Sequence, residues 1–345
     1  MRGTIQDYAV IVNNVVKHIA PKVSPKVKSE YLDYMYKVDN GERIYSDVGV
    51  TGLGMGEIIP DGGIGASDAP IQGYSKNYTQ MHFTKKVRLT FQTNFFLLEG
   101  AAAKIKSTVK GKVLEGKDAI EHAKNYLAQA LLAQGFGTSF TWTPINSVGT
   151  PTPVSTLGAD GVEYWSQVHP REDGGTAWSN VVVDGAIASP AFSYSALLAA
   201  RRLHALKKDG RGNPLLSMLD TLVCRAGSNT AQFAKTIKST IDKGLAPQQV
   251  NLFNNAPATD TFKILELSPY EGLGISGLAW GMFDSNMKNK DFGFLYIEAL
   301  ATRAEPAVVD SLGNQDLVMN FNSLAVMGAS DMRGWVWSAG DGSTT

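Results

Sequence analysis

The fold is decided by the stretch GVTGLGMGEIIPDGGIGASDAPIQG (Gly49–Gly73) and by the stretch that follows it, YSKNYTQMHFTKKVRLTFQ (Tyr74–Gln92). The first stretch contains eight glycines and two prolines, and this composition excludes a helix. A loop of this length without secondary structure is uncommon inside a compact domain, and where one occurs it usually has a function. We therefore expect this loop to have a role of its own.

The second stretch has the pattern of a β-strand. From Met81 to Phe91, apolar residues alternate with polar ones, and Lys85 is the single exception. Counted from Tyr74, the strand would span about 19 residues and reach roughly 60 Å at ~3.3 Å per residue, whereas ordinary strands have about 5–6 residues. We expect a β-arm that leaves the globular body. Burying its five apolar side chains on a partner is worth on the order of 10 kcal/mol before ordering costs.

Composition limits the possible classes of protein. The chain has 345 residues, enough for two domains or one large one, and its 43% hydrophobic and 19% charged residues exclude overall disorder. Lys plus Arg and Asp plus Glu both number 32, so the net charge is zero. This balance disfavours a dedicated nucleic-acid binder and suits a protein that packs against copies of itself. The one cysteine, Cys224, excludes an intrachain disulfide, and no apolar run reaches the roughly 18 residues of a membrane span.

Apolar periodicity predicts four helices, at Val27–Val38, Gly100–Gln134, Ser195–Lys208 and Asn229–Lys243. We expect Gly111 and Gly116 to interrupt the longest one. Asp118 and Glu121 then form a capping-box pattern that predicts a new helix start at Asp118. Before Lys26 the pattern is mixed, and Pro21 and Pro25 limit any helix. Strands are expected at Leu215–Arg225, Phe262–Leu267, Gly293–Ile297, Leu317–Phe321 and Trp335–Trp337.

The motifs of common enzymes are absent or misplaced. Gly272–Gly277 matches the glycine pattern of dinucleotide-binding loops, but Pro269 stands between it and the preceding strand, and a poor helix start follows. We interpret it as a glycine-rich turn. The chain has neither a nucleophile-elbow serine motif nor a phosphate-binding loop.

Two smaller candidates have both a chemical and a structural interpretation. His169 with Glu172 and Asp173 could hold a metal in a loop and serve a cytosolic enzyme, or could form a solvated polar turn, which we favour. Cys224 follows Leu222 and Val223, which favours a buried thiol in the core over a nucleophile. We therefore expect no enzyme, no cofactor and no metal.

Three motifs, in order along the chain, point to a family. The first is an aromatic short helix followed by ERIYSDVGVTGLGM (Glu42–Met55) and IQGYSKNYTQMHFTKKVRLT (Ile71–Thr90). The second is HPREDGGTAWSN (His169–Asn180), and the third is LDTLVCRAGSNTAQFAKTI (Leu219–Ile237) followed by FKILELSPY (Phe262–Tyr270). Together they resemble the major capsid (head) proteins of tailed double-stranded-DNA bacteriophages. The second motif is similar to an element of the Mu-like branch of these proteins.

The resemblance implies the α+β capsid fold named after phage Hong Kong ninety-seven. That fold has an N-terminal arm, an extended β-hairpin loop, a peripheral domain with a long spine helix and a β-sheet, and an axial α/β domain. On this chain the resemblance places the arm at 1–47, the extended loop at 48–89 and the peripheral domain at 90–189. It places the axial domain at 190–306, and strands that return to the peripheral domain at 307–345.

The implied function is structural. Such a protein assembles with itself as hexamers and pentamers into an icosahedral head that encloses double-stranded DNA, and it resides in the virion after assembly in the cytoplasm of the bacterial host. Further implied partners are a portal protein, a separate scaffold and decoration proteins, and packaged DNA bound without sequence preference; no membrane is implied. The alternative within the same fold is an encapsulin-like shell of a bacterial nanocompartment.

The extended loop supplies the candidate site residues. Contact with a neighbouring subunit is expected from Lys76, Met81, Phe83, Lys85, Lys86, Val87, Arg88 and Leu89. Hinging of the loop is expected at Gly52, Gly54, Gly56, Gly62 and Gly63, because glycine adopts backbone conformations that other residues avoid.

The basic residues of the arm have more than one interpretation. They could meet acidic groups of a neighbour or nucleic acid, or they could be a solvated face that prevents edge-to-edge aggregation. Some relatives cross-link a lysine of this loop to an asparagine, and Lys76, Lys85 and Lys86 lie on the corresponding loop. We identify no matching acid–asparagine set in the sequence.

Overall fold

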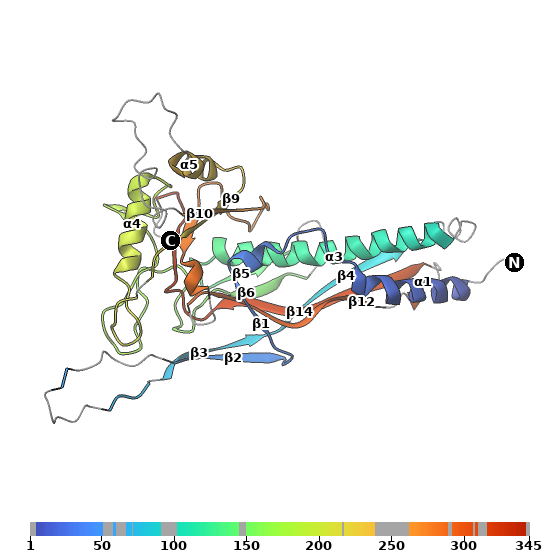
Figure 1. Cartoon of the computed structure of the whole chain (residues 1–345), viewed down its shortest axis with the longest axis horizontal. Coiled ribbons are helices and arrows are strands. Elements are labelled where there is room, and N and C mark those ends of the chain that lie inside the picture. The colour runs from blue at the N-terminus through green and yellow to red at the C-terminus, as the bar shows by residue number, and fades with distance from the viewer. Residues whose placement is uncertain are drawn as a thin grey trace.

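One long helix, α3 (Ala102–Ala133), runs along the long axis of the molecule beside a β-sheet (Figure 1). The computed structural model describes residues 5–50, 58–59, 67–70, 72–90, 102–144, 150–215, 217–238, 262–288, 292–305, 308–309 and 316–342. The helix forms because apolar residues recur on one face at three- and four-residue spacing. The buried stripe consists of Val109, Val113, Ile120, Leu127 and Leu131.

The helix is continuous where the sequence predicts a break. At Gly116 a Cβ atom would lie 2.4 Å from the ring of Phe321, so this glycine allows the helix to approach the sheet. Asp118 does not cap a helix start, because its carboxylate accepts hydrogen bonds from the backbone N–H groups of Lys26 (2.7 Å) and Val27 (3.3 Å). The predicted interruption and the predicted N-cap are both wrong, since tertiary contacts use these residues.

The central sheet lies against α3. Its strands are β1 (Tyr36–Asp39), β4 (Met81–Leu89), β12 (Phe294–Ala304), β13 (Val308–Val309) and β14 (Leu317–Ala329). β14 pairs in antiparallel fashion with β12 and β13 and with β4, and β1 pairs with β12 in parallel. Apolar residues alternate along β14, so that Met319 and Phe321 reach the core beneath α3.

A second sheet stands at one end of the molecule, with α4 (Tyr194–Ala205) and α5 (Asn229–Lys238) beside it (Figure 1). Its strand order is β10 (Lys263–Leu267), β9 (Thr221–Arg225), β11 (Trp280–Phe283) and β15 (Trp335–Ser338). β9 and β10 are parallel, whereas β11 is antiparallel to both of its neighbours. The predicted helices at 195–208 and 229–243 are confirmed in place, the second over its described part, and so is the strand at 262–267.

The N-terminal segment lies along α3, and its secondary structure differs most from the sequence-based expectation. Helix α1 (Ile5–Ile19) precedes the 3-10 turn η1 (Ala20–Lys22), which contains Pro21. The predicted helix 27–38 is wrong: only a 3-10 turn, η2 (Glu30–Asp33), and then β1 occur there. Tyr31 and Tyr34 are 3% and 1% exposed, so burial against neighbouring elements, rather than helix formation, explains their spacing.

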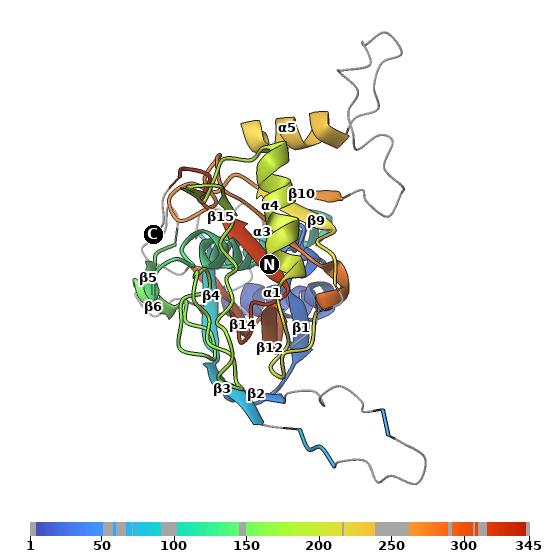
Figure 2. The same cartoon turned by 90° about the vertical axis from the view of Figure 1, so that its left-hand side faces the viewer.

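Three short hairpins complete the described structure. They consist of β2 (Ile44–Val50) with β3 (Gln72–Thr79), β5 (Ser139–Trp142) with β6 (Thr152–Ser155), and β7 (Val183–Asp184) with β8 (Ile187–Ala188). A last 3-10 turn is η5 (Ser285–Met287). The β2–β3 hairpin lies on the side of the body opposite to α5 (Figure 2).

The predicted α+β class is confirmed, with a long helix on a sheet and a hairpin outside it. The predicted single strand from Tyr74 to Gln92 is wrong, because the chain changes partners at Gln80: β3 pairs with β2, and β4 pairs with β14. The backbone N–H of Gln80 donates to Arg43 O (3.0 Å), which closes the hairpin at this point. Within the described residues, no helix is long and apolar enough to cross a membrane.

Candidate functional site

One face of the β2–β3 hairpin packs on its own subunit, and the other face is exposed. Tyr45 lies opposite Tyr78, and Asp47 lies opposite Lys76, and these residues face the body. Residues of the other register, among them Ile44 (50% exposed) and Val48 (44% exposed), point outward. The alternation follows from the period of two along a strand. The outer face therefore carries exposed apolar side chains that no described part of the subunit covers.

Partly buried polar contacts around Asp47, Lys76 and Tyr78 hold the root of the hairpin. The Lys76 ammonium donates to Leu157 O (2.6 Å), to Ala329 O (3.0 Å) and to the Tyr164 hydroxyl (3.1 Å). The hydroxyl of Ser330 donates to the Asp47 carboxylate and also contacts the Tyr78 hydroxyl at 2.7 Å. Lys76, predicted to contact a neighbour, is thus an anchor within its own chain. These contacts fix the position from which the hairpin projects.

β4 belongs to the core of the subunit. Phe83 is 6% exposed and Leu89 is 1% exposed, and both lie in the main apolar cluster beneath α3. Met81 and Val87 are half-buried and pack against the same cluster. Phe83 and Leu89 therefore leave the set of candidate contacts with a neighbour, because the subunit already buries them.

The basic residues of β4 remain on the surface. Lys85 and Lys86 are exposed, and Arg88 pairs with Asp316 at 3.8 Å. Among the described strands, β4 pairs only with β14, so it forms an edge of the central sheet. Exposed lysines on an edge strand discourage unwanted strand pairing, which fits the structural interpretation of this cluster. The predicted hinge glycines, at 52, 54, 56, 62 and 63, lie outside the described residues.

A groove of about 770 Å³ lies between β4 and α3. Met81 and Phe83 line it from the sheet, Ile120 and Ala123 line it from the helix, and Trp142 closes one side. Within the described part of the chain, both polar atoms of the Gln80 side-chain amide are buried without a partner, and so is the indole Nε1 of Trp142. Such atoms are costly unless something supplies their hydrogen bonds. The exposed surface of the groove is itself mostly apolar, and His82, Thr84 and Lys85 add polar side chains to its wall.

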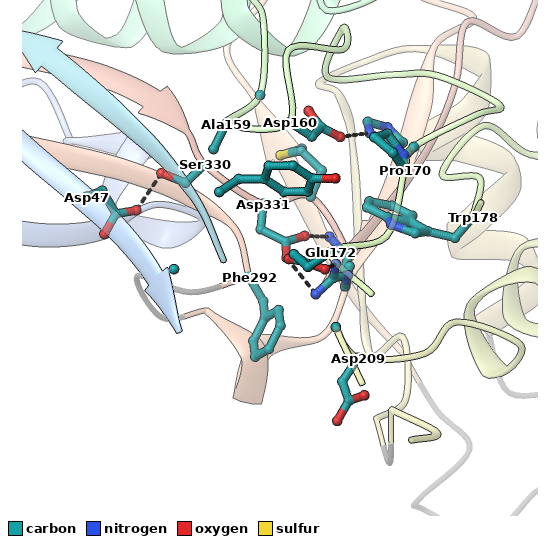
Figure 3. Close-up of a pocket in the computed structure, with 17 residues that line it drawn as sticks. Asp47, Ala159, Asp160, Pro170, Glu172, Trp178, Asp209, Phe292, Ser330 and Asp331 are labelled. Atoms are coloured by element: carbon teal, nitrogen blue, oxygen red, sulfur yellow. Dashed lines mark hydrogen bonds and ion pairs between the residues drawn. The ribbon is translucent and has the colours of Figure 1, made fainter. Parts of the chain in front are cut away.

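A second, smaller pocket of about 90 Å³ lies at the hairpin root (Figure 3). His169 Nδ1 lies 2.7 Å from the Asp160 carboxylate, and the His169 ring stacks on Trp178 with centroids 4.2 Å apart. Arg333 binds Glu172 and also Asp331, the latter at 3.1 Å. Burial raises the pKa of Asp331 despite the positive charge of Arg333. The lining of this pocket comes both from the hairpin, through Asp47 and Tyr74, and from the turn before β15, through Asp331 and Arg333.

The side chains of the candidate metal loop form ion pairs with other residues of the chain. His169 pairs with Asp160, Glu172 pairs with Arg333, and Asp173 pairs with Arg171. Among the residues that the structure describes, no group of three or more His, Cys, Asp or Glu side chains could hold a metal ion. The motif His169–Asn180 instead closes on itself, since His169 and Trp178 exchange backbone hydrogen bonds of 2.8 and 3.0 Å.

The two remaining motifs have the structural role that we favoured. Cys224 lies fully buried in β9, and burial raises the pKa of its thiol to about 12, so the reactive thiolate is disfavoured. Gly272–Gly277 forms a turn between β10 and β11, with Gly272 at φ +75°. Positive φ there explains the glycine without a cofactor.

The sequence analysis missed the groove, because its walls come from segments far apart along the chain. The sequence does contain a signal for the outer hairpin face. Ile44 and Val48 are four residues apart within the motif Glu42–Met55, so they lie on the same face of a strand. Two further exposed apolar residues, Ile58 (101%) and Ile59 (43%), belong to the segment between β2 and β3.

No family model matches the chain, and no curated protein matches it. Similar backbones occur in solved structures of Mycobacterium phage Bobi (TM-score 0.47, 11% identity, 91% of both chains covered) and Microbacterium phage Oxtober96 (TM-score 0.48, 9% identity, 92% of both chains covered). Another is the capsid of a native GTA particle (TM-score 0.47, 13% identity, 91% of this chain and 94% of that chain covered). With TM-scores below 0.5, these likenesses carry no functional argument, and we argue function from the chain's own contacts.

Proposed function

We propose that this chain is the major capsid protein of a tailed bacteriophage and that its β2–β3 hairpin binds a neighbouring copy. One observation carries the proposal: the hairpin is fixed by its inner face and exposes Ile44 and Val48 on its outer face. In a monomer these two apolar side chains stay in contact with water, whereas a neighbouring copy could bury them. Because Ile44 and Val48 are already about half-buried in the subunit, burying the rest of each side chain on a partner contributes roughly 1 kcal/mol per side chain.

The groove between β4 and α3 is the receiving surface that we favour for a neighbour's hairpin. Most of its exposed surface is apolar, with Met81 and Phe83 on the sheet wall and Ile120 and Ala123 on the helix wall. A strand-like segment would place apolar side chains against these walls. A hairpin on a groove is a head-to-tail contact, and such contacts form rings such as hexamers and pentamers when the rotation between neighbouring copies closes.

Sheet membership supports a refined version of the domain division. β4 pairs with β14, which supports ending the extended loop near Gln80 rather than at residue 89. β12 also lies in the central sheet, which supports ending the axial domain before Phe294. β15 pairs with β11, which supports assigning the last strand to the axial part rather than to the peripheral domain. The N-terminal arm then includes α1 and the turns along α3.

The remaining parts of the proposal follow from the resemblance of the sequence motifs. They are an icosahedral head around double-stranded DNA, a location in the virion after assembly in the host cytoplasm, and partnership with portal, scaffold and decoration proteins. Membership of the Mu-like branch rests on the motif His169–Asn180. The structure supports a packing role for that motif, since the Trp178 ring contacts both His169 and Arg333.

The test uses the purified full chain, negative-stain electron microscopy and sedimentation velocity. Uniform shells, or rings of hexamers and pentamers, are expected. In the variant Ile44→Asp/Val48→Asp we expect assembly to be lost while the far-UV circular dichroism of the subunit is retained. Val168→Asp, at a position 63% exposed outside the hairpin, serves as the control that still assembles.

Two results would contradict the proposal. One is a stable 37.1 kDa monomer of the unmodified chain at every concentration and salt. The other is normal assembly of the double variant, which would mean that the outer hairpin face is not an interface. If shells form, their diameter distinguishes a large phage head from a small nanocompartment.

A further inference from the structure

A third pocket, of about 440 Å³, lies beside the C-terminal end of α4. Its lining comes from residues 167–179 and 203–208, and three of the lining residues are the cations Arg171, Lys207 and Lys208. None of the described lining residues is an aspartate or a glutamate. In a chain whose net charge is zero, such a local excess of positive charge favours an anionic ligand.

Two side chains of this pocket have a buried N–H group without a hydrogen-bond partner in the described part of the chain. One is Nε of Arg171, whose side chain is 8% exposed, and the other is Nε1 of Trp178, a residue that is also 8% exposed. Both groups can donate a hydrogen bond and neither can accept one. Buried donors without partners are costly, so a ligand that offers acceptor oxygens would be stabilised here.

The guanidinium of Arg171 is held in place by its own chain. A Cβ at Gly175 would lie 2.6 Å from Arg171 Nη1, and a Cβ at Gly212 would lie 2.7 Å from Nη2, so both glycines leave space for this side chain. Nη2 also pairs with Asp173, which offsets part of the positive charge but leaves Nε unused. A side chain that is already ordered loses little conformational entropy when it binds a ligand.

The two lysines contribute charge in different ways. Lys207 is buried, and its ammonium donates to the backbone oxygens of Arg333 (3.1 Å) and Trp335 (2.5 Å). This fixes its charge 5.2 Å from the centre of the Trp178 ring. Lys208 is exposed, so its ammonium is free to turn toward a ligand in the pocket.

We propose that this pocket binds a phosphate group, with Arg171 and Trp178 as hydrogen-bond donors and Lys208 as a charged partner. A phosphate group has more acceptor oxygens than a carboxylate, so it can meet donors from several residues at once. The pocket lies within one subunit, so this binding does not require the assembly proposed above. The phosphate group has two possible sources, free phosphate and the backbone of DNA, and the experiment distinguishes them.

The indole N–H of Trp178 reports binding directly. Amide and indole spectra of unassembled full-length subunits with isotopically labelled tryptophan are recorded by nuclear magnetic resonance, during a titration with sodium phosphate at constant ionic strength. We expect a saturable downfield shift of the Trp178 signal, which Trp178→Phe identifies by its loss. The indole of Trp142 also lacks a partner among the described residues but lies in the groove between β4 and α3, so its signal should not shift.

Substitutions of the cations test the assignment. Arg171→Gln should weaken phosphate binding about ten-fold, and Lys208→Gln about three-fold. Lys263→Gln removes the same charge from an exposed position of β10 and should leave the affinity unchanged. The Trp165 indole donates to Leu132 O in the core, so its unchanged signal shows that a variant is folded. If Arg171→Gln alters that signal, the titration of Lys208→Gln decides.

A second titration, with a short DNA duplex, distinguishes the two sources. A shift of the Trp178 signal at a lower phosphate concentration with the duplex than with sodium phosphate would assign the site to the DNA backbone. A shift with sodium phosphate at an equal or lower concentration would assign it to free phosphate. The proposal is overturned if neither reagent shifts the Trp178 signal, or if folded Arg171→Gln and Lys208→Gln bind phosphate as tightly as the unmodified chain.

Discussion

At the scale of single residues, we expect alanine substitutions at two glycines of α3 to change the stability of the subunit in opposite directions. A Cβ at Gly116 would lie 2.4 Å from the buried ring of Phe321, whereas a Cβ at Gly111 meets nothing within 4 Å. Gly116→Ala should therefore destabilise the subunit by about 1–3 kcal/mol through overpacking. Gly111→Ala should stabilise it by up to ~1 kcal/mol, because alanine favours the helix. Urea unfolding of both variants measures this difference, and two shifts of the same sign would contradict the packing of α3 on β14.

A substitution at Lys76 distinguishes the two interpretations of this residue, an anchor within its own subunit and a contact with a neighbour. Lys76→Met leaves Leu157 O and Ala329 O without their donor and should cost about 1–3 kcal/mol in the unassembled subunit. Lys85→Met, at an exposed position of β4, should change the unfolding free energy by less than about 0.5 kcal/mol. Thermal unfolding of unassembled protein provides the measurement. If Lys76→Met left the subunit's stability intact and impaired assembly alone, the sequence interpretation of Lys76 would be right and the anchor wrong.

At the scale of elements, α4 should make the protein sensitive to acid. His204, near its C-terminus, is 1% exposed, and burial together with the charge of Lys207 lowers its pKa from 6.5 to about 3. The unfolded state therefore takes up a proton that the folded state refuses, and stability is lost as pH falls from 6.5 toward 3. At pH 4.5 the loss from this residue should be about 2–3 kcal/mol.

The histidine contribution is isolated by comparing the unfolding free energies of the unmodified chain and His204→Gln at pH 7.5 and pH 4.5. The acid loss should be smaller in His204→Gln, which keeps a polar side chain near Ser217. His82→Gln, at an exposed position of β4, should lose as much stability as the unmodified chain. Equal acid losses in all three proteins would show that His204 takes up its proton without unfolding.

Which elements the sequence predicts depends on where their side chains find partners. α4 and α5 were predictable because their apolar spacing and their end signals agree with their packing. The turn at residues 30–33 was not, because Tyr31 and Tyr34 pack on other elements, and a 3-10 turn satisfies their spacing as a helix would. α1 was missed although Val12, Val16 and Ile19 share one of its faces, because Pro21 and Pro25 were expected to limit any helix there, whereas α1 ends at Ile19, before both prolines.

The candidate site was predictable to the same limited extent. Alternation along Met81–Leu89 correctly indicated a strand, but alternation alone does not say which surface covers the apolar side. The subunit's own helix α3 covers Phe83 and Leu89, and for this reason we propose the exposed outer face of β2, in place of these two residues, as the contact with a neighbour. Lys76 shows the same limit, since its three acceptors are 81, 88 and 253 residues away along the chain.

At the scale of the whole molecule, the second sheet joins two apolar cores. β15 alternates between them: Trp335 and Trp337 belong to the core with α3, and Val336 belongs to the core with α4 and α5. Trp337 also stacks on Trp165, with ring centroids 5.1 Å apart. Because close-packed neighbours cannot rearrange independently, the two cores should unfold in one cooperative transition.

Met282→Ala tests this coupling from the α4 side. Met282 is fully buried in the core with α4 and α5, so its truncation should cost about 2–5 kcal/mol. Hydrogen exchange at rising urea concentration should show the midpoint of α3 peptides falling together with that of α5 peptides. Met218→Ala, at a residue 55% exposed, is the matched control and should move neither midpoint appreciably. A shift confined to α5 would show instead that the two parts unfold separately, and the hairpin's support would then not depend on the second sheet.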